Sequence, residues 1–139
     1  MTVEIVFPIE FIVAGTPASL QTKRPETRRA WKAHVREASR AALPEGHFST
    51  AVPVAVTLFY FPVSVMQGDI DNIVKPVLDA LCQHVYEDDR QVERVWVQKF
   101  EPRGDVEFNS PSDVLANAIR GVRPILFIRV TDDLNERLT

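Results

Sequence analysis

The chain has 139 residues, enough for one domain to bury a core without a metal or a disulfide to hold it together. Its 45% hydrophobic and 25% charged residues are typical of a globular protein. Cys82 is the only cysteine, which excludes an intrachain disulfide, and no apolar run approaches the roughly 20 residues that a membrane-spanning helix needs. These features predict a single cytoplasmic domain over 1–139, with the polar stretch 131–139 as a frayed tail.

Charge is distributed unevenly along the chain. The net charge of −3 and the pI near 5.6 do not by themselves indicate a nucleic-acid-binding protein. One segment is strongly basic and contains Lys23, Arg24, Arg28, Arg29, Lys32, Arg36 and Arg40. A later segment is acidic and contains Asp69, Asp71, Asp79, Glu87, Asp88 and Asp89 around the single base Lys75. Each segment alone is more often a solvated helix or loop, but together they are typical of a metal-dependent nuclease, which binds phosphates and holds cations.

The first half of the chain predicts two strands around one helix. A strand over 3–13 ends at the turn at 15–17, and a polar loop over 19–24 follows it. A helix over 26–42 is indicated by apolar residues near helical spacing, with most of the bases on its other faces. The strand over 52–61 is apolar on both faces, so we expect it in the centre of the sheet.

The second half continues the alternation of helices and strands. A helix is predicted over 73–82, with Pro76 in its first turn or at a kink. A strand over 91–100, a short helix over 113–119 and a last strand over 124–130 follow. This order predicts an α+β fold, in which a single mixed sheet of about four strands packs against two main helices.

The helix over 73–82 is preceded by two carboxylates, Asp69 and Asp71. One aspartate at this place is explained as an N-cap that accepts hydrogen bonds from free amide groups, but the second is not. A calcium-binding EF-hand loop also begins with Asp-x-Asp, yet it requires Gly at its sixth position and Glu at its twelfth. Those positions hold Val74 and Ala80, which excludes the EF-hand.

A second acidic run, at 87–89, directly precedes the strand over 91–100. Such runs are usually solvated turns. Two carboxylates about 4 Å apart repel by roughly 4 kcal/mol at an effective dielectric constant of 20, so converging carboxylates need a cation or protonation. Oxygen ligands suit Mg²⁺, for which Mn²⁺ can substitute, and such an ion keeps room for a phosphate and activates water.

The two acidic runs must lie close together to share an ion. The helix between them is about 15 Å long, and the six residues 83–88 span at most about 20 Å when extended. The chain can therefore return beside the helix, which predicts that the strands over 52–61 and 91–100 are antiparallel. Parallel strands would instead require Asp89 from a second subunit.

These acids are part of a longer gapped pattern. Its first part reads Asp69-Ile-Asp71-Asn72-x-x-Lys75-x-x-x-Asp79-Ala-Leu81, and its second part reads Glu87-Asp88-Asp89-x-Gln91-Val92. The pattern resembles the RusA family of Holliday junction resolvases closely over 69–92, and loosely at Gly15-x-Pro17-x-Ser19 and the basic segment after it. The resemblance implies Mg²⁺-dependent hydrolysis of four-way DNA junctions by a homodimer, with one symmetric nick per subunit.

The resemblance also implies roles for individual residues. The family's essential acids, which are the expected metal ligands, correspond to Asp69, Asp71 and Asp89. Its essential lysine corresponds to Lys75, which would stabilise charge on the phosphate or the leaving oxygen. Asp88 is expected to lie beside the metal ligands without binding the ion directly. Asp79 is expected to form an ion pair with Lys75.

Other interpretations remain open at this point. Lys75 alone is better explained as an i,i+4 ion-pair partner of Asp71 and Asp79. The same metal site would also serve a nuclease that acts on flaps, replication forks or nicked duplex, and the fold alone would serve a non-catalytic dimeric DNA-binding protein. The residues expected to contact DNA phosphates, because they lie near the polar loop, are Lys23, Arg24, Arg28 and Arg29.

Overall fold

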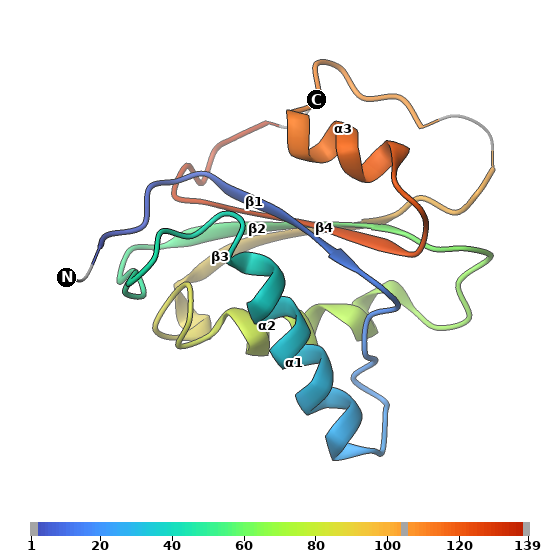
Figure 1. The fold of residues 1–139 in the computed structure, drawn as a ribbon, viewed down its shortest axis with the longest axis horizontal. Helices are drawn as coiled ribbons and strands as arrows, with labels where there is room; N and C mark the ends of the chain where they lie inside the picture. The colour runs from blue at the N-terminus through green and yellow to red at the C-terminus, as the bar shows by residue number, and fades with distance from the viewer. Residues whose placement is uncertain (1–2, 104–105, 138–139) are drawn as a thin grey trace.

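The computed structural model describes residues 3–103 and 106–137 (Figure 1). Its strands and helices alternate in the predicted order, with short 3-10 helices, η1 and η2, before α2 and β3. The elements are β1 (Ile9–Ala14), α1 (Pro25–Ser39), β2 (Val54–Phe61), η1 (Ile70–Ile73), α2 (Val74–Leu81), η2 (Asp89–Gln91), β3 (Val92–Lys99), α3 (Asp113–Arg120) and β4 (Ile125–Thr131). The strand β1 is shorter than predicted because Pro8, directly before it, has no N–H for a strand ladder.

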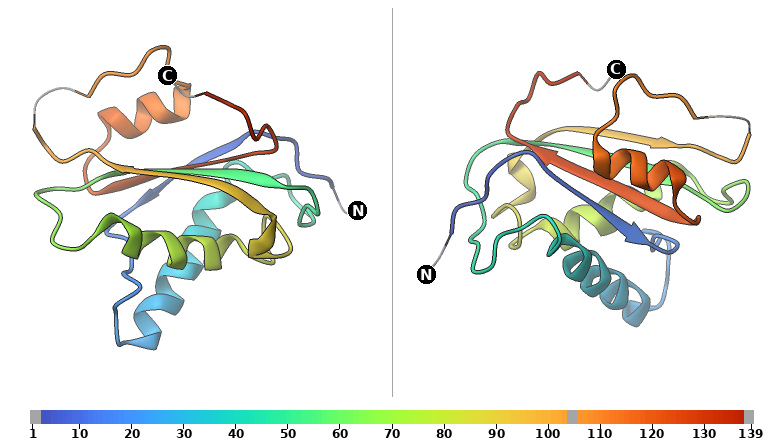
Figure 2. Two further views of the ribbon diagram at one scale, coloured as in Figure 1. Left: turned by 180° about the vertical axis from the view of Figure 1, so that it is seen from behind. Right: turned by 45° about the horizontal axis from the view of Figure 1, so that its top comes forward.

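The four strands form one mixed sheet in the order β1-β4-β2-β3. The strand β4 is antiparallel to both of its neighbours, β1 and β2, whereas β2 and β3 are parallel. Figures 1 and 2 show α1 and α2 on one face of the sheet and α3 on the other. The predicted α+β fold with a four-stranded mixed sheet is confirmed. No helix in the described ranges is long and apolar enough to cross a membrane.

The predicted direction of β3 was wrong. It runs parallel to β2, with Val56 opposite Val95 and Leu58 opposite Val97. Parallel neighbours need a crossover connection, and α2 provides it by carrying the chain back to the starting end of the sheet (Figure 2). Residues 83–88 are therefore a short turn into β3 and do not retrace the length of the helix.

The core lies mainly between the sheet and the helices α1 and α2. Every residue of β2 is buried, as expected for a central strand. Trp31 and Val35 of α1 are buried against this cluster. Pro76 is the third residue of α2, where an amide N–H has no carbonyl partner within the helix, so the proline is accommodated without a kink in the ladder. A smaller, phenylalanine-rich cluster lies on the face covered by α3.

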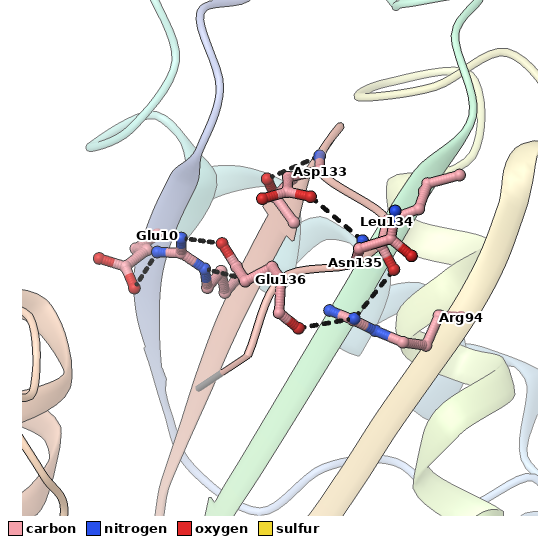
Figure 3. A network of polar contacts seen from close by, with 8 residues as sticks. Glu10, Arg94, Asp133, Leu134, Asn135 and Glu136 are labelled. Atoms are coloured by element: carbon pink, nitrogen blue, oxygen red, sulfur yellow. Dashed lines mark hydrogen bonds and ion pairs between the residues drawn. The ribbon is translucent and has the colours of Figure 1, made fainter. Parts of the chain in front are cut away.

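The polar tail does not fray where the structure describes it. Thr131 still belongs to β4, and Figure 3 shows the following residues folded back onto the sheet. Arg94 Nη1 donates hydrogen bonds to the carbonyl oxygens of Leu134 (3.0 Å) and Glu136 (2.8 Å). The carboxylate of Glu136 also pairs with Arg129. The prediction of a frayed tail was wrong for 131–137, because two sheet arginines bind it, and 138–139 lie outside the described residues.

Candidate active site

The first part of the acidic pattern lies at the start of the η1–α2 segment. Asp69 is the N-cap residue of η1 and has extended backbone angles, but its side chain accepts no capping hydrogen bond. Asp71 lies in the first turn of η1. Both side chains are exposed. The structure therefore provides no capping role for either carboxylate, and both remain available for a ligand.

Asp89, from the second part of the pattern, meets α2 through Lys75. The Nζ atom of Lys75 lies 2.7 Å from Asp89 Oδ2 and 2.7 Å from Asp79 Oδ1. The expected ion pair between Lys75 and Asp79 is confirmed. Hydrogen bonds to Asp79 and then Asp89 raise the pKa of Lys75, so its ammonium group is held firmly in the charged form.

The parallel direction of β3 does not separate these groups. Asp89 lies directly before β3, and the long side chain of Lys75 reaches it within one chain. The expectation that parallel strands would require Asp89 of a second subunit concerns its grouping with Asp69 and Asp71; the contact with Lys75 does not test it, and it stays a prediction.

Asp88 has a different role from its neighbour. Its side chain caps η2 by accepting a hydrogen bond from the backbone N–H of Arg90 (2.9 Å). This hydrogen bond lowers the pKa of Asp88. The side-chain amide of Gln91 completes the capping box, because its oxygen accepts from the backbone N–H of Asp88. Its nitrogen donates to the carbonyl oxygens of Thr50 (2.8 Å) and Val52 (3.0 Å). Together these bonds hold η2 against the chain before β2, and Asp88 serves to fix this turn.

Sequence reasoning missed Tyr86, which contacts Asp89 from inside the protein. The tyrosine is completely buried. Its hydroxyl group lies 2.9 Å from the carbonyl oxygen of Leu78, to which it donates, and 3.3 Å from Asp89 Oδ1. Burial raises the pKa of Tyr86, so the hydroxyl keeps its proton. The only available sequence signal was an aromatic residue just before an acidic run, which is not specific.

The structure thus brings together Lys75, Asp79 and Asp89 from the predicted pattern. In the ranges that the structure describes, no three His, Cys, Asp or Glu side chains converge closely enough to hold a metal ion. Asp69 instead lines a cavity of about 320 Å³ with residues of the loop after β2. The grouping of Asp69 and Asp71 with Asp89 around one ion therefore stays a prediction.

The basic segment forms the outer part of α1 and the loop before it. Lys23 and Arg24 precede the helix, whereas Arg28 and Arg29 lie on it; all four side chains are exposed. None of the four forms an ion pair within the described residues. Arg36 differs, because it is partly buried and donates to two backbone carbonyls at the end of α2. The four exposed bases remain free to bind an anion.

Comparison with known families identifies the chain. The family model described as Endodeoxyribonuclease RusA matches residues 13–107, a range that contains α1, all of the acidic pattern and β3. It leaves α3 and β4 outside. A search of curated proteins found no match. Since the match covers more than half of the chain and includes every predicted site residue, the protein belongs to the RusA family of endodeoxyribonucleases, which are Holliday junction resolvases and hydrolases.

Proposed function

We propose that this protein nicks four-way DNA junctions as a Mg²⁺-dependent homodimer, using Asp69, Asp71, Asp89 and Lys75 in each subunit. The observation that carries the proposal is the 2.7 Å contact between Lys75 Nζ and Asp89 Oδ2. This contact joins the two halves of the gapped pattern, although 14 positions separate them in the sequence. This contact between the two parts of the pattern supports a single reaction centre. Two unrelated, solvated segments would not be expected to make it.

The chemistry of the donor set fits Mg²⁺. All three proposed ligands are carboxylates, and hard oxygen donors are those that Mg²⁺ and Mn²⁺ prefer. Asp69 and Asp71 are exposed and have no capping hydrogen bonds, so both carboxylates are available to an ion. When bound, the ion would supply an activated water and stabilise charge on the phosphate.

Lys75 is proposed to act on the phosphate itself. Its ammonium group has three donors, and two of them are accounted for by Asp79 and Asp89. The third is available for a phosphate oxygen. Asp79 would keep the ammonium group at the site if Asp89 turned toward a metal ion. A fixed positive charge at this place would stabilise the charge that develops during hydrolysis.

A homodimer suits this substrate for reasons of symmetry. A two-fold axis between identical subunits presents two equal sites, and a two-fold axis through a four-way junction relates its four strands in two pairs. One nick from each subunit would then resolve the junction into two duplexes. The family assignment supports this arrangement, which we propose for the present chain.

The proposal is tested by comparing substrates and metals. Purified protein is incubated with labelled four-way junction, flap and linear duplex DNA, with and without Mg²⁺, beside Asp71→Asn. We expect symmetric nicks in the junction that require Mg²⁺ and are lost in the variant. Preferred cleavage of the flap would show that the substrate is a flap and not a four-way junction. Binding without cleavage in every metal condition would contradict a nuclease function.

Tyr86→Phe is expected to raise the Mg²⁺ concentration needed for half-maximal nicking by about tenfold, because Asp89 loses the polar hydroxyl group that lies 3.3 Å from its Oδ1. The fold should survive, because the carbonyl oxygen of Leu78, which loses the tyrosine hydroxyl, still accepts a hydrogen bond from the backbone N–H of Cys82 (2.9 Å). The measurement is nicking rate against Mg²⁺ concentration. Ile128→Val, a change in the buried core of β4, serves as the control for lost packing. An unchanged Mg²⁺ requirement would limit Tyr86 to a structural role.

A further inference from the structure

We propose that a groove between α1 and α2, lined by Arg28, Arg29 and Lys32, binds backbone phosphates of the DNA next to the cleaved bond. The inference rests on the proposed function and adds to it the path of the substrate. The groove has a volume of about 520 Å³. It adds Lys32 to the best candidates for DNA binding, which the sequence had limited to Lys23, Arg24, Arg28 and Arg29. It also distinguishes the bases of the groove from Lys23 and Arg24, which are not in its lining.

The groove is formed by one face of each helix. Residues 25, 28, 29 and 32 of α1 recur at the spacing of a single helical face. Opposite them lie residues 76 and 79 of α2, followed by 82 and 83 just after the helix. The buried residues Trp31 and Val35 are not in the lining, so the groove runs beside the hydrophobic contact between the helices and the sheet.

The groove wall on α1 carries positive charge that the protein does not neutralise. Arg28, Arg29 and Lys32 are exposed, and none forms an ion pair within the described ranges. Arg28 and Lys32 are four residues apart on α1, and like charges at this spacing destabilise a helix slightly. An arrangement with this small cost is explained by an anionic ligand, and DNA phosphates have the required charge.

The helices that form the groove are tied together at one end. Arg36 follows Lys32 by four residues and donates from Nε to the carbonyl oxygen of Ala80 (2.9 Å) and from Nη2 to that of Cys82 (2.9 Å). Because these bonds fix α1 to the end of α2, the spacing between the two walls is set before any ligand binds. A preformed site loses less conformational entropy on binding.

The groove also leads to the proposed reaction centre. Asp79 is part of its lining, and Lys75 joins Asp79 to Asp89 by contacts of 2.7 Å each. The negative charge of Asp79 is partly offset by Lys75, which weakens its repulsion of a phosphate. A strand held by the α1 bases would therefore place a neighbouring phosphate beside Lys75 and Asp89.

The inference is tested by the salt dependence of junction binding. The full-length protein is titrated against fluorescent four-way junction in EDTA, between about 50 and 200 mM salt. We expect Lys32→Ala to lower the slope of log affinity against log salt by about one for each bound subunit, and Arg28→Ala/Arg29→Ala/Lys32→Ala by about three. Lys32→Arg keeps the charge and should keep the slope. Lys23→Ala should lower it less than Lys32→Ala.

Arg120→Ala is the matched control, because it removes an exposed base from α3 on the other face of the sheet. If Lys32→Ala and Arg120→Ala change the slope equally, the groove is not a phosphate site. The nicking assay with Asp71→Asn is run in parallel and separates the two proposals. A protein that nicks junctions but shows no groove effect contradicts only the groove, whereas a groove effect without nicking contradicts only the proposed function.

Discussion

Asp89→Asn is expected to lower the rate of junction nicking by at least about 10³-fold. The variant keeps the size of the side chain but removes the negative charge that is proposed to bind the metal ion, and the charge stabilisation lost with a catalytic metal is worth several kcal/mol. At about 1.4 kcal/mol for each factor of ten, a loss of about 4 kcal/mol corresponds to this change. The measurement is the single-turnover rate at saturating Mg²⁺.

Asp88→Asn provides a matched control for that experiment. Asp88 is adjacent in sequence and has the same charge, but its side chain caps η2 instead of meeting Lys75. Asparagine is as good an N-cap as aspartate, so the turn should remain in place. We expect a rate within a few-fold of the unmodified protein. Equal losses in Asp88→Asn and Asp89→Asn would contradict the separate roles that the structure indicates.

Lys75→Ala is expected to lower the nicking rate by about 10²–10³-fold, the usual effect of removing one group that stabilises developing charge. Junction affinity in EDTA should change by only a few-fold, because the α1 bases are proposed to supply most of the phosphate contacts. Stability should also change little, since Lys75 is half exposed and exposed ion pairs contribute roughly 0–1 kcal/mol. Single-turnover rates, binding titrations and thermal unfolding separate these three effects.

Lys99→Ala is the control for the general loss of a positive charge. Lys99 is also a partly exposed lysine with a carboxylate partner, Glu101, but it lies at the far end of β3 from Asp89. We expect its nicking rate to remain within a few-fold of that of the unmodified protein. A nicking rate of Lys75→Ala that remains within threefold of the unmodified protein would exclude the proposed role of Lys75 in the reaction.

Much of the fold could be predicted because it depends on local patterns. The alternation of apolar residues and the position of Gly and Pro predicted the order of strands and helices, and Ser112 caps α3 by accepting from the backbone N–H of Leu115 as its residue type suggests. The apolar character of β2 on both faces predicted its central place. The direction of β3 could not be predicted from the maximum length of residues 83–88. A segment of this length can connect α2 to a strand that is either parallel or antiparallel to β2.

The amino-acid sequence by itself determined the family and the residues of the acidic pattern, because spacing along a chain is a property of the sequence alone. The i,i+4 spacing also predicted the ion pair of Lys75 with Asp79, but only the tertiary structure decided that Asp89 meets Lys75. It placed Lys75 between Asp79 and Asp89, assigned Asp88 to a turn and added Tyr86 from the core. It also showed that some bases of α1 line a groove, whereas Arg36 holds α1 to the end of α2 through hydrogen bonds. Contacts between distant segments depend on how the helices pack on the sheet, and no local pattern contains that information.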